Sequence, residues 1–412
     1  MAEPTPLVLN GAYMIRAGSS VTAEGSAELR IGPDGVFIAP GAGPPTGIPY
    51  TDMEAILCGE HVITVPLRGG QVLQLRRLGG RFDEAFLALR QCHVDALSVA
   101  LLVAEPTVVE AFGAEFASHD SVPAEAEVRL YDTRLGVFPY DGAPLVAEYS
   151  ELAGISFDAA SYRVVFSLVG GGQLWLGKLG RRSQDLPDQL NALRARASGW
   201  TQQALQRLFP SLPGLTLAQL AGTMRHGFAV CTREFVNWGV DPWAAIEALL
   251  PGADSEGTLA RTAIRDTCPD GQAWIGVAVF PGSGFFSEQS QLDPVTDESG
   301  SPADWMVYAL GLLPGGRSIA YEVLTAEDCA TYGFRIEAES EWSELLRCLR
   351  RVQFRREPIS VAEADLATAK AGRYALAARV VPELQWLRQR FLGRALHTSV
   401  DAWLDAVRRW QD

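Results

Sequence analysis

The chain has 412 residues, a formal net charge of -14 and a pI near 4.9, and 48% of its residues are hydrophobic. This apolar content excludes an intrinsically disordered protein, and at roughly 100–200 residues per domain the length predicts two to four domains. The excess of acidic residues argues against broad electrostatic binding to nucleic acid or anionic lipid, although it leaves room for a local basic patch.

The cysteines and the apolar segments indicate the compartment. The six cysteines form no C-x-x-C pair, which is typical of reduced core residues in an intracellular protein. The first residues lack a charged segment followed by an apolar stretch, so we expect no signal peptide. The longest apolar stretch, residues 96–109, is too short to span a bilayer. We therefore expect a cytoplasmic protein without a transmembrane segment.

Five short sequence blocks recur in the same order in residues 27–90 and 126–194. The first copy reads AELR, GVF, PYTDMEAI, GGQVLQLRRLGGR and ALR. The second copy reads AEVRL, GVF, EYSELAGI, GGGQLWLGKLGRR and ALR, so that Tyr149 corresponds to Tyr50. Five matches in register indicate an internal duplication.

Each block has the pattern of a β-rich module that ends in a helix. Polar and apolar residues alternate in the first block, which is typical of a half-buried strand. Residues 32–35 (GPDG) predict a turn between two strands, and the glycines at 69–70 and 170–172 predict hairpin tips. The helices that follow carry Phe82 and Leu89 on the apolar face of the first copy, and Leu186 and Leu190 on that of the second.

The remaining segments complete the expected domain organisation. Residues 93–116 and 361–412 favour helices, and residues 199–266 favour three or four helices, one of them capped by Asp241. Residues 272–354 have the same order of strands first and helix last, so they predict a diverged third copy. The expected units are residues 1–125 (first module and helical linker), 126–198 (second module), 199–270 (helical linker), 271–356 (third module) and 357–412 (C-terminal helices).

Several strands in hairpin order, closed by one amphipathic helix, resemble the pleckstrin-homology-like (PH-like) fold in a tandem arrangement of bacterial type. The helix ESEWSELLRCLRR, which contains Trp342, looks most like the closing helix of that family. The first copy has Phe82 and Phe86 there instead, and the second has no aromatic residue. The resemblance implies a scaffold for binding phosphoinositides, peptides or proteins. Lipid-binding members carry Lys and Arg in the first hairpin loop, whereas residues 32–35 and 40–47 have no basic residue, so phosphoinositide binding is not supported.

Three groups of basic residues are candidates for contact with a partner or an anion. The two duplicated zones comprise Arg68, Arg76, Arg77 and Arg81 in the first module and Arg163, Lys178, Arg181 and Arg182 in the second. The third group comprises Arg347, Arg350, Arg351, Arg355 and Arg356, of which the first three share one helix face. The alternative for all three groups is a solvated face, which is the usual role of a charge run.

Catalytic and metal-binding motifs are not apparent in the sequence. The five histidines have no metal-ligand spacing, and there is no nucleotide-binding glycine motif. We therefore expect no catalytic residue, no cofactor and no metal.

The sequence predicts an α+β protein with two to three antiparallel modules, each closed by a helix. The first functional hypothesis is a non-catalytic adaptor or regulator that binds another protein. One alternative is a module that binds a lipid headgroup or nucleic acid through the duplicated arginine zones, although the net negative charge argues against nucleic acid. The other alternative is an enzyme with a site assembled from distant residues.

Overall fold

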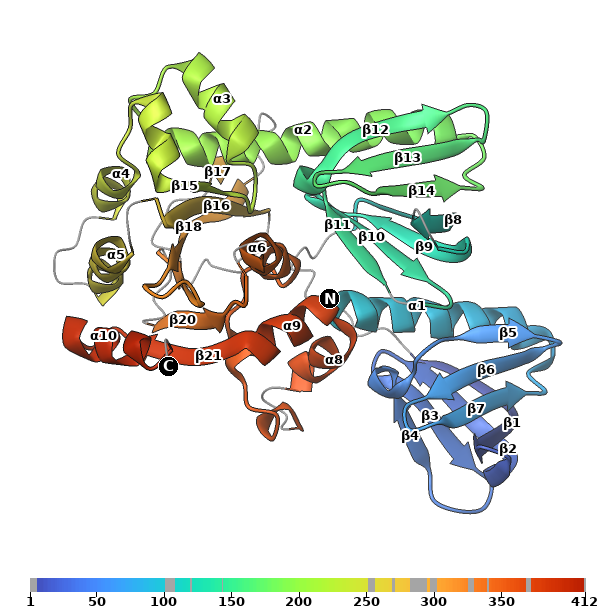
Figure 1. Ribbon diagram of the computed structural model, residues 1–412. Coiled ribbons are helices and arrows are strands. Elements are labelled where there is room, and N and C mark those ends of the chain that lie inside the picture. Colours follow the sequence, from blue (N-terminus) through green and yellow to red (C-terminus); the bar gives the residue numbers. More distant parts are fainter. Residues whose placement is uncertain are drawn as a thin grey trace.

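The computed structural model has an α+β architecture with three antiparallel sheets of seven strands each (Figure 1). It describes residues 6–100, 108–118, 121–142, 144–250, 256–268, 271–281, 295–296, 302–324, 330–338, 341–367 and 372–410. No helix in these described ranges is long and apolar enough to cross a membrane.

The first two sheets have the same strand order. The first sheet contains β1 (Leu7–Ala17), β2 (Ser20–Gly32), β3 (Gly35–Pro40), β4 (Thr46–Pro49), β5 (Leu57–Gly59), β6 (Val62–Leu67) and β7 (Gln71–Arg76). The second contains β8 (Glu110–Ser118), β9 (Ala124–Leu130), β10 (Arg134–Pro139), β11 (Leu145–Glu148), β12 (Leu152–Asp158), β13 (Arg163–Leu168) and β14 (Gln173–Gly177). The orders β4-β3-β2-β1-β7-β6-β5 and β11-β10-β9-β8-β14-β13-β12 match position by position, as a duplication requires.

The predicted turns lie between the expected strands. The GPDG turn joins β2 to β3, the glycines at 69–70 join β6 to β7, and the glycines at 170–172 join β13 to β14. A short 3₁₀ helix also recurs at the same place: η1 (Tyr50–Asp52) follows β4, and η3 (Tyr149–Glu151) follows β11. The sequence blocks that revealed the duplication therefore coincide with repeated structural elements.

Each of these sheets shares its core with the helix that follows it. Helix α1 (Phe82–Ala100), which comes after the 3₁₀ turn η2 (Gly79–Arg81), contributes Ala85 and Leu89 to the core of the first module. Helix α2 (Arg182–Leu208) contributes Leu186, Leu190 and Leu193 to the core of the second. We call these two units the first and second modules.

The third sheet is covered by helices on both faces. It contains β15 (Ala229–Cys231), β16 (Ala273–Pro281), β17 (Val295–Thr296), β18 (Pro302–Leu312), β19 (Ser318–Val323), β20 (Ala330–Arg335) and β21 (Phe391–Leu396). The helical elements around it are α3 (Gly214–Thr223), η4 (Thr232–Trp238), α4 (Pro242–Leu249), α5 (Glu256–Thr267), α6 (Glu341–Arg351), α7 (Glu357–Ser360), η5 (Asp365–Ala367), α8 (Gly372–Val380), α9 (Pro382–Arg390) and α10 (Val400–Arg408). The strands β16, β18, β19 and β20 are therefore almost continuously buried, whereas β21 is mostly half-buried or exposed.

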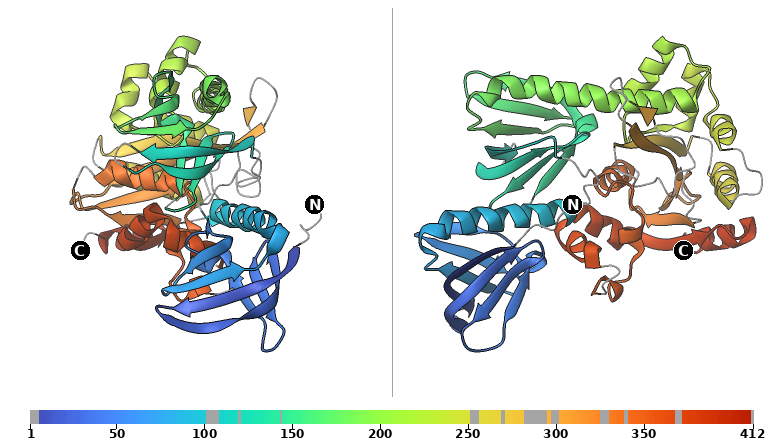
Figure 2. Two further views of the ribbon diagram at one scale, coloured as in Figure 1. Left: turned by 90° about the vertical axis from the view of Figure 1, so that its right-hand side faces the viewer. Right: turned by 180° about the vertical axis from the view of Figure 1, so that it is seen from behind.

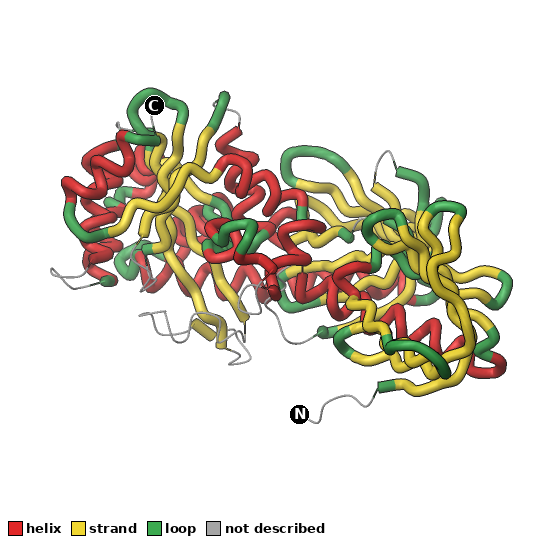
Figure 3. The backbone as a smooth tube through the Cα atoms, turned by 90° about the horizontal axis from the view of Figure 1, so that it is seen from below, coloured by secondary structure: helices red, strands yellow, loops and turns green. Residues whose placement is uncertain are grey.

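Apolar cores lie on both faces of this sheet, and a further buried cluster joins α5 and α10 to Ala273, Ala320 and Ala395 of its strands. The end of α2, together with α3 and α4, packs on one face, and α6, α8 and α9 pack on the other. Figure 3 shows this succession of helix, sheet and helix from below. We call the sheet and its helices the third domain.

The third domain differs from the expected third module. Its strand order, β15-β16-β18-β19-β20-β21, is not that of the modules, and β15 and β21 lie outside residues 271–356. The described residues of segments 199–270 and 357–412 therefore belong to this domain, and they are neither a separate helical linker nor a purely helical C-terminus. The predicted N-cap is confirmed, because the Asp241 carboxylate accepts hydrogen bonds from the N–H groups of Trp243 and Ala244.

Residues 110–118 also differ from the expected helix. They form β8 in the second module, with Phe112 and Phe116 packed against its core. Pairing with β9 and β14 gives this segment partners on both sides, and that tertiary context outweighs its content of Ala and Glu.

The modules and the third domain share packed side chains. Val94 and Leu97 near the end of α1, and Phe138 of β10, belong to the same buried cluster as Leu345 and Leu349 of α6. Helix α2 contacts β12 of the second module and β16 of the third domain, and it runs from one to the other in Figure 2. The three units are therefore joined by common cores.

Candidate functional site

The 3₁₀ turn η3 places acidic side chains of the second module against the third domain. The turn is held by a capping box, in which the N–H of Glu148 donates to the Glu151 carboxylate at 3.1 Å. The Tyr149 hydroxyl donates to the carbonyl oxygen of Tyr131 at 2.9 Å, and Tyr50 makes the same bond to Gly32 at 2.8 Å in the first module. The repeated tyrosine therefore fixes the turn within each module.

Glu148 is a buried carboxylate surrounded by cationic and donor groups. Its side chain is 2% exposed and lies 3.3 Å from Nε2 of His226 and 3.9 Å from Arg134. The N–H of Val279 donates to Nδ1 of His226 at 3.0 Å, so the proton of that imidazole is on Nε2, which faces Glu148. Burial alone would raise the pKa of Glu148, but His226, Arg134 and Arg350 outweigh it and lower that pKa to about 2.

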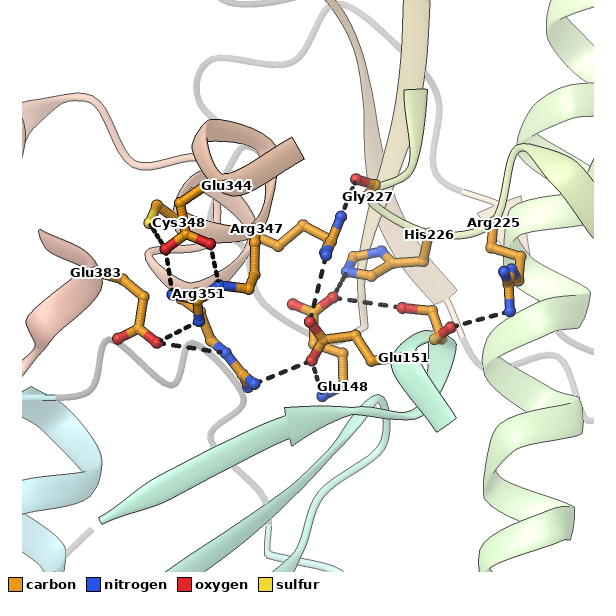
Figure 4. A network of polar contacts seen from close by, with 12 residues as sticks. Glu148, Glu151, Arg225, His226, Gly227, Glu344, Arg347, Cys348, Arg351 and Glu383 are labelled. Atoms are coloured by element: carbon orange, nitrogen blue, oxygen red, sulfur yellow. Dashed lines mark hydrogen bonds and ion pairs between the residues drawn. The ribbon is translucent and has the colours of Figure 1, made fainter. Parts of the chain in front are cut away.

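Glu151 connects the same turn to α6. Its two carboxylate oxygens lie 3.4 Å from Arg350 and 3.3 Å from Arg351, and both guanidinium groups are largely buried. These are ion pairs between residues about 200 positions apart in the chain, and they attach the second module to the third domain. Figure 4 shows them beside His226 and Glu148.

The network continues along α6 to α9. Arg347 binds Glu344 and Glu383 at 2.7 Å each, and Arg351 lies 3.9 Å from Glu383. The hydrogen bonds that Arg347 donates to Glu344 and Glu383 raise the pKa of Arg347 against the opposing effect of its burial. The basic face of α6 is therefore satisfied by acids of the chain itself (Figure 4).

Gly227 allows the side chain of Arg350 to pass close to the backbone. Its φ is +72°, and a Cβ at this position would lie 2.6 Å from Cδ of Arg350. The Arg350 guanidinium lies 4.1 Å from the ring centroid of Phe228 and donates to the Gly227 carbonyl oxygen at 3.5 Å. A side chain at position 227 would push Arg350 away from Glu151.

A pocket of about 640 Å³ opens on the other side of η3, between the second module and the third domain. One wall is a face of α2, since Asn191, Arg194, Ala195 and Ser198 have helical spacing. The other walls come from the second module and from the segment after α3, and they include Thr133, Tyr149, Ser150, Leu152, Arg225 and His226. Hydroxyl, amide and guanidinium groups therefore converge on one cavity.

The two arginines of this pocket contact neutral oxygen atoms. Arg225 donates to the carbonyl oxygen of Ser150 at 3.3 Å, and Arg194 donates to that of Leu152 at 3.2 Å. Burial, with added repulsion from Arg350 and Arg194, lowers the pKa of Arg225. Within the described ranges, Nε of Arg225 is buried without a hydrogen-bond partner. Among the described residues, no carboxylate pairs with either arginine of the pocket.

The first predicted arginine zone lies apart from this pocket. Arg76 donates to Gln74 of its own strand, Arg77 is exposed, and Arg81 binds Glu84 at 2.8 Å. The Arg76 contact is part-buried and the Arg81 ion pair is exposed. Arg81 also donates to the carbonyl oxygen of Val8 at 2.7 Å, so all these contacts stay within the first module.

The second predicted zone is similar. Lys178 lies 3.0 Å from Glu115, Arg182 pairs with Glu110, and Arg181 is exposed at the start of α2. The two zones are therefore not brought together into one site, and each is partly neutralised by acids of its own module.

Sequence reasoning missed the residues that form the junction, namely Glu148, Glu151, Arg194, Arg225 and His226. Among the predicted contact residues, only Arg347, Arg350 and Arg351 belong to the network, and they bind acids of this chain. One signal was present for Glu148 and Glu151: both flank the duplicated tyrosine, where the first copy has Pro49 and Asp52. No local pattern distinguishes Arg225 and His226.

Within the described ranges, no group of three or more His, Cys, Asp or Glu side chains could hold a metal ion.

Comparisons with known proteins give no family for this chain. No family model and no curated protein matches it. Among the solved structures that match is the C-terminal domain of an unknown protein from Leishmania infantum, which has 15% sequence identity and a TM-score of 0.22 and covers 24% of this chain and 94% of its own. A likeness at this level supports no statement about fold or function.

Proposed function

We propose that the protein is a non-catalytic adaptor or regulator whose ligand site is the pocket between the second module and the third domain. The observation that carries this proposal is the pocket itself. Its volume of about 640 Å³ is in the range of small-molecule sites, and its walls combine apolar surface with a few convergent polar groups.

The two modules are proposed to be PH-like. The shared strand order and the contributions of α1 and α2 to the module cores support this proposal. Because PH-like scaffolds serve binding more often than catalysis, the assignment favours an adaptor. The ligand site proposed here does not use the first hairpin loop, which lacks basic residues.

The chemistry of the pocket favours binding over catalysis. His226 is the natural general base, but its Nδ1 accepts the Val279 N–H and its Nε2 faces Glu148. Neither nitrogen is therefore available to activate Ser150 or Ser198. No described carboxylate lines the pocket either, so the arrangement lacks a base for acid–base or nucleophilic chemistry.

Blocking the pocket tests the proposal. We would screen the purified full chain against a fragment library by ligand-observed NMR and repeat the screen with Ala195→Trp, which places an indole in the pocket. Ala192→Trp is the matched control, since Ala192 is exposed on the same helix but does not line the pocket. We expect ligands of the native chain to be lost in Ala195→Trp and kept in Ala192→Trp.

Two results would count against the proposed function. Ligands that bind Ala195→Trp as well as they bind the native chain do not occupy the pocket. Steady turnover of a bound ligand by the purified protein would contradict the non-catalytic role.

Binding of a partner protein is a second proposed role, supported by the outer face of the first module. Val8, Arg30 and Phe37 are cross-strand neighbours on β1, β2 and β3. Val8 and Phe37 are exposed, and the Arg30 guanidinium lies 5.9 Å from the Phe37 ring centroid. Aromatic and arginine side chains are enriched in protein interfaces.

Affinity purification of the tagged protein with variants tests this second role. A partner that binds the surface of Val8, Arg30 and Phe37 should be recovered in stoichiometric amount at high salt with the native chain. Val21→Ser, which changes an exposed valine outside this surface, should recover the same amount. The partner should be lost with Phe37→Ser. Equal recovery with Phe37→Ser would remove this surface from consideration.

A further inference from the structure

We infer that the junction pocket takes a small organic molecule with a phosphate-type oxyanion group, which Arg194 and Arg225 bind together. This inference rests on the proposed function of the pocket as a ligand site and adds the chemical class of the ligand. It concerns residues that lie outside the two duplicated arginine zones.

The charges around η3 are divided unequally between its two sides. On the side of α6, the carboxylates of Glu148 and Glu151 face His226, Arg350 and Arg351. On the side of the pocket, Arg194 and Arg225 have only carbonyl oxygens as described hydrogen-bond acceptors. In a chain with 49 acidic and 35 basic residues, two neighbouring arginines without a described carboxylate partner are a built-in site for an external anion.

The two guanidinium groups destabilise each other while the pocket is empty. Burial disfavours the charged form of Arg225, and Arg350 and Arg194 add repulsion in the same direction. An oxyanion between Arg194 and Arg225 reverses the sign of this interaction and supplies acceptors for the unsatisfied Nε of Arg225. Guanidinium groups favour phosphate and carboxylate because their N–H groups match paired oxygen atoms.

The size and lining of the pocket indicate an organic ligand. A volume of about 640 Å³ exceeds what a bare inorganic ion fills, and Leu152, Ala153 and Ala195 provide apolar wall near the arginines. Asn191 lies one helical turn before Arg194 on α2 and adds an amide to the same wall. The ligand therefore combines an anionic group with an apolar or weakly polar body.

The position of the two arginines gives binding a structural consequence. Arg194 lies on the part of α2 that packs in the second module, directly after the core residue Leu193, and Arg225 lies in the segment between α3 and β15 of the third domain. A ligand held by both connects the second module to the third domain in addition to the ion pairs of Glu151. Occupied protein should therefore unfold at a higher temperature than empty protein.

Phenyl phosphate and phenol form a matched pair of probes for the full-length protein. We would measure both by isothermal titration calorimetry, and we would add vesicles that contain phosphatidic acid to present the same oxyanion on a lipid. We expect phenyl phosphate to bind about tenfold or more tightly than phenol, because charged hydrogen bonds contribute factors of this size. Binding should weaken as salt rises.

Variants connect this binding to the two arginines. We expect Arg194→Gln and Arg225→Gln each to weaken phenyl phosphate binding by about tenfold or more. Arg77→Gln, an exposed arginine outside the pocket, should leave it within about twofold. Each pocket variant removes a hydrogen bond to one backbone carbonyl oxygen but no described ion pair. Thermal unfolding of the unliganded variants should therefore stay close to the native temperature, which separates lost binding from lost folding.

The outcomes separate this inference from the proposed function. Suppose that phenol and phenyl phosphate bind equally, and that Ala195→Trp abolishes this binding whereas Arg225→Gln does not. That result would overturn the anion assignment and keep the pocket as a ligand site. Phenyl phosphate binding that survives Ala195→Trp would overturn both. If phenyl phosphate does not bind, a soluble organic phosphate is overturned as the ligand, whatever the vesicles do. If the vesicles bind and Arg225→Gln removes that binding, the oxyanion belongs to a lipid.

Discussion

Glu148→Gln should destabilise the protein by about 3 kcal/mol at neutral pH. The carboxylate is 2% exposed, and its pKa falls from 4.5 to about 2 because the effects of His226, Arg134 and Arg350 exceed the effect of burial. At about 1.4 kcal/mol per pKa unit, this difference corresponds to about 3 kcal/mol. Removal of one partner of a buried ion pair independently costs roughly 3–5 kcal/mol, so the two arguments agree.

The assay is urea denaturation of the native chain and Glu148→Gln between pH 7 and pH 3. The folded-state pKa of Glu148 lies below the unfolded-state value, so its contribution is complete above about pH 4.5 and is lost as the pH falls toward 2. We therefore expect a clear difference in free energy of unfolding at pH 7 and a smaller difference at pH 3.

Glu28→Gln is the matched control, because Glu28 pairs with Arg30 on an exposed surface, where an ion pair contributes about 0–1 kcal/mol. Our reasoning about Glu148 is refuted if Glu148→Gln unfolds at the native urea concentration at pH 7. It is also refuted if the difference between the two proteins stays constant down to pH 3.

Three further predictions concern stability in urea. Tyr50→Phe and Tyr149→Phe should each cost about 1 kcal/mol, since each hydroxyl donates a hydrogen bond to a carbonyl oxygen, part-buried for Tyr50 and buried for Tyr149. Equal stability of both variants and the native chain would contradict this. Glu322→Gln should cost roughly 3–5 kcal/mol, because its buried carboxylate contacts a threonine, a histidine and an arginine side chain of the third domain. Leu190→Ala should cost about 2–5 kcal/mol and exposed Leu215→Ala less than about 0.5 kcal/mol, and similar losses would refute the assignment of α2 to the module core.

The parts of the fold that sequence reasoning predicted are those fixed by local chemistry. Turns rich in glycine, alternating strands and amphipathic helices depend on residues close in the chain. The matches between the two copies are informative for the same reason: Tyr50 and Tyr149 bond within their own modules. The duplication was therefore visible without any knowledge of the third domain.

The segments that were predicted incorrectly are those whose structure depends on distant partners. Strand β8 was expected as helix, although Phe112, Ala114 and Phe116 alternate, because its Ala and Glu residues favour a helix locally. Strand β21 begins at Phe391, directly after α9 ends at Arg390, with no proline or loop between them. In both cases, pairing with neighbouring strands decides the structure.

Differences between the two copies indicate where the second module docks. Pro49 is exposed beside Tyr50, whereas Glu148 in the corresponding position is buried beside Tyr149. Asp52 is half-buried, whereas Glu151 is buried against α6. A buried carboxylate at position 148, where the first copy has an uncharged proline, lowers the stability of the fold unless a partner neutralises its charge. The partner of Glu148 is His226, in the segment that also carries Arg225, and the partners of Glu151 are Arg350 and Arg351 of α6. Residues that are the same in both copies therefore identify the module. Residues that differ around the repeated tyrosine identify the surface by which the second module contacts the third domain.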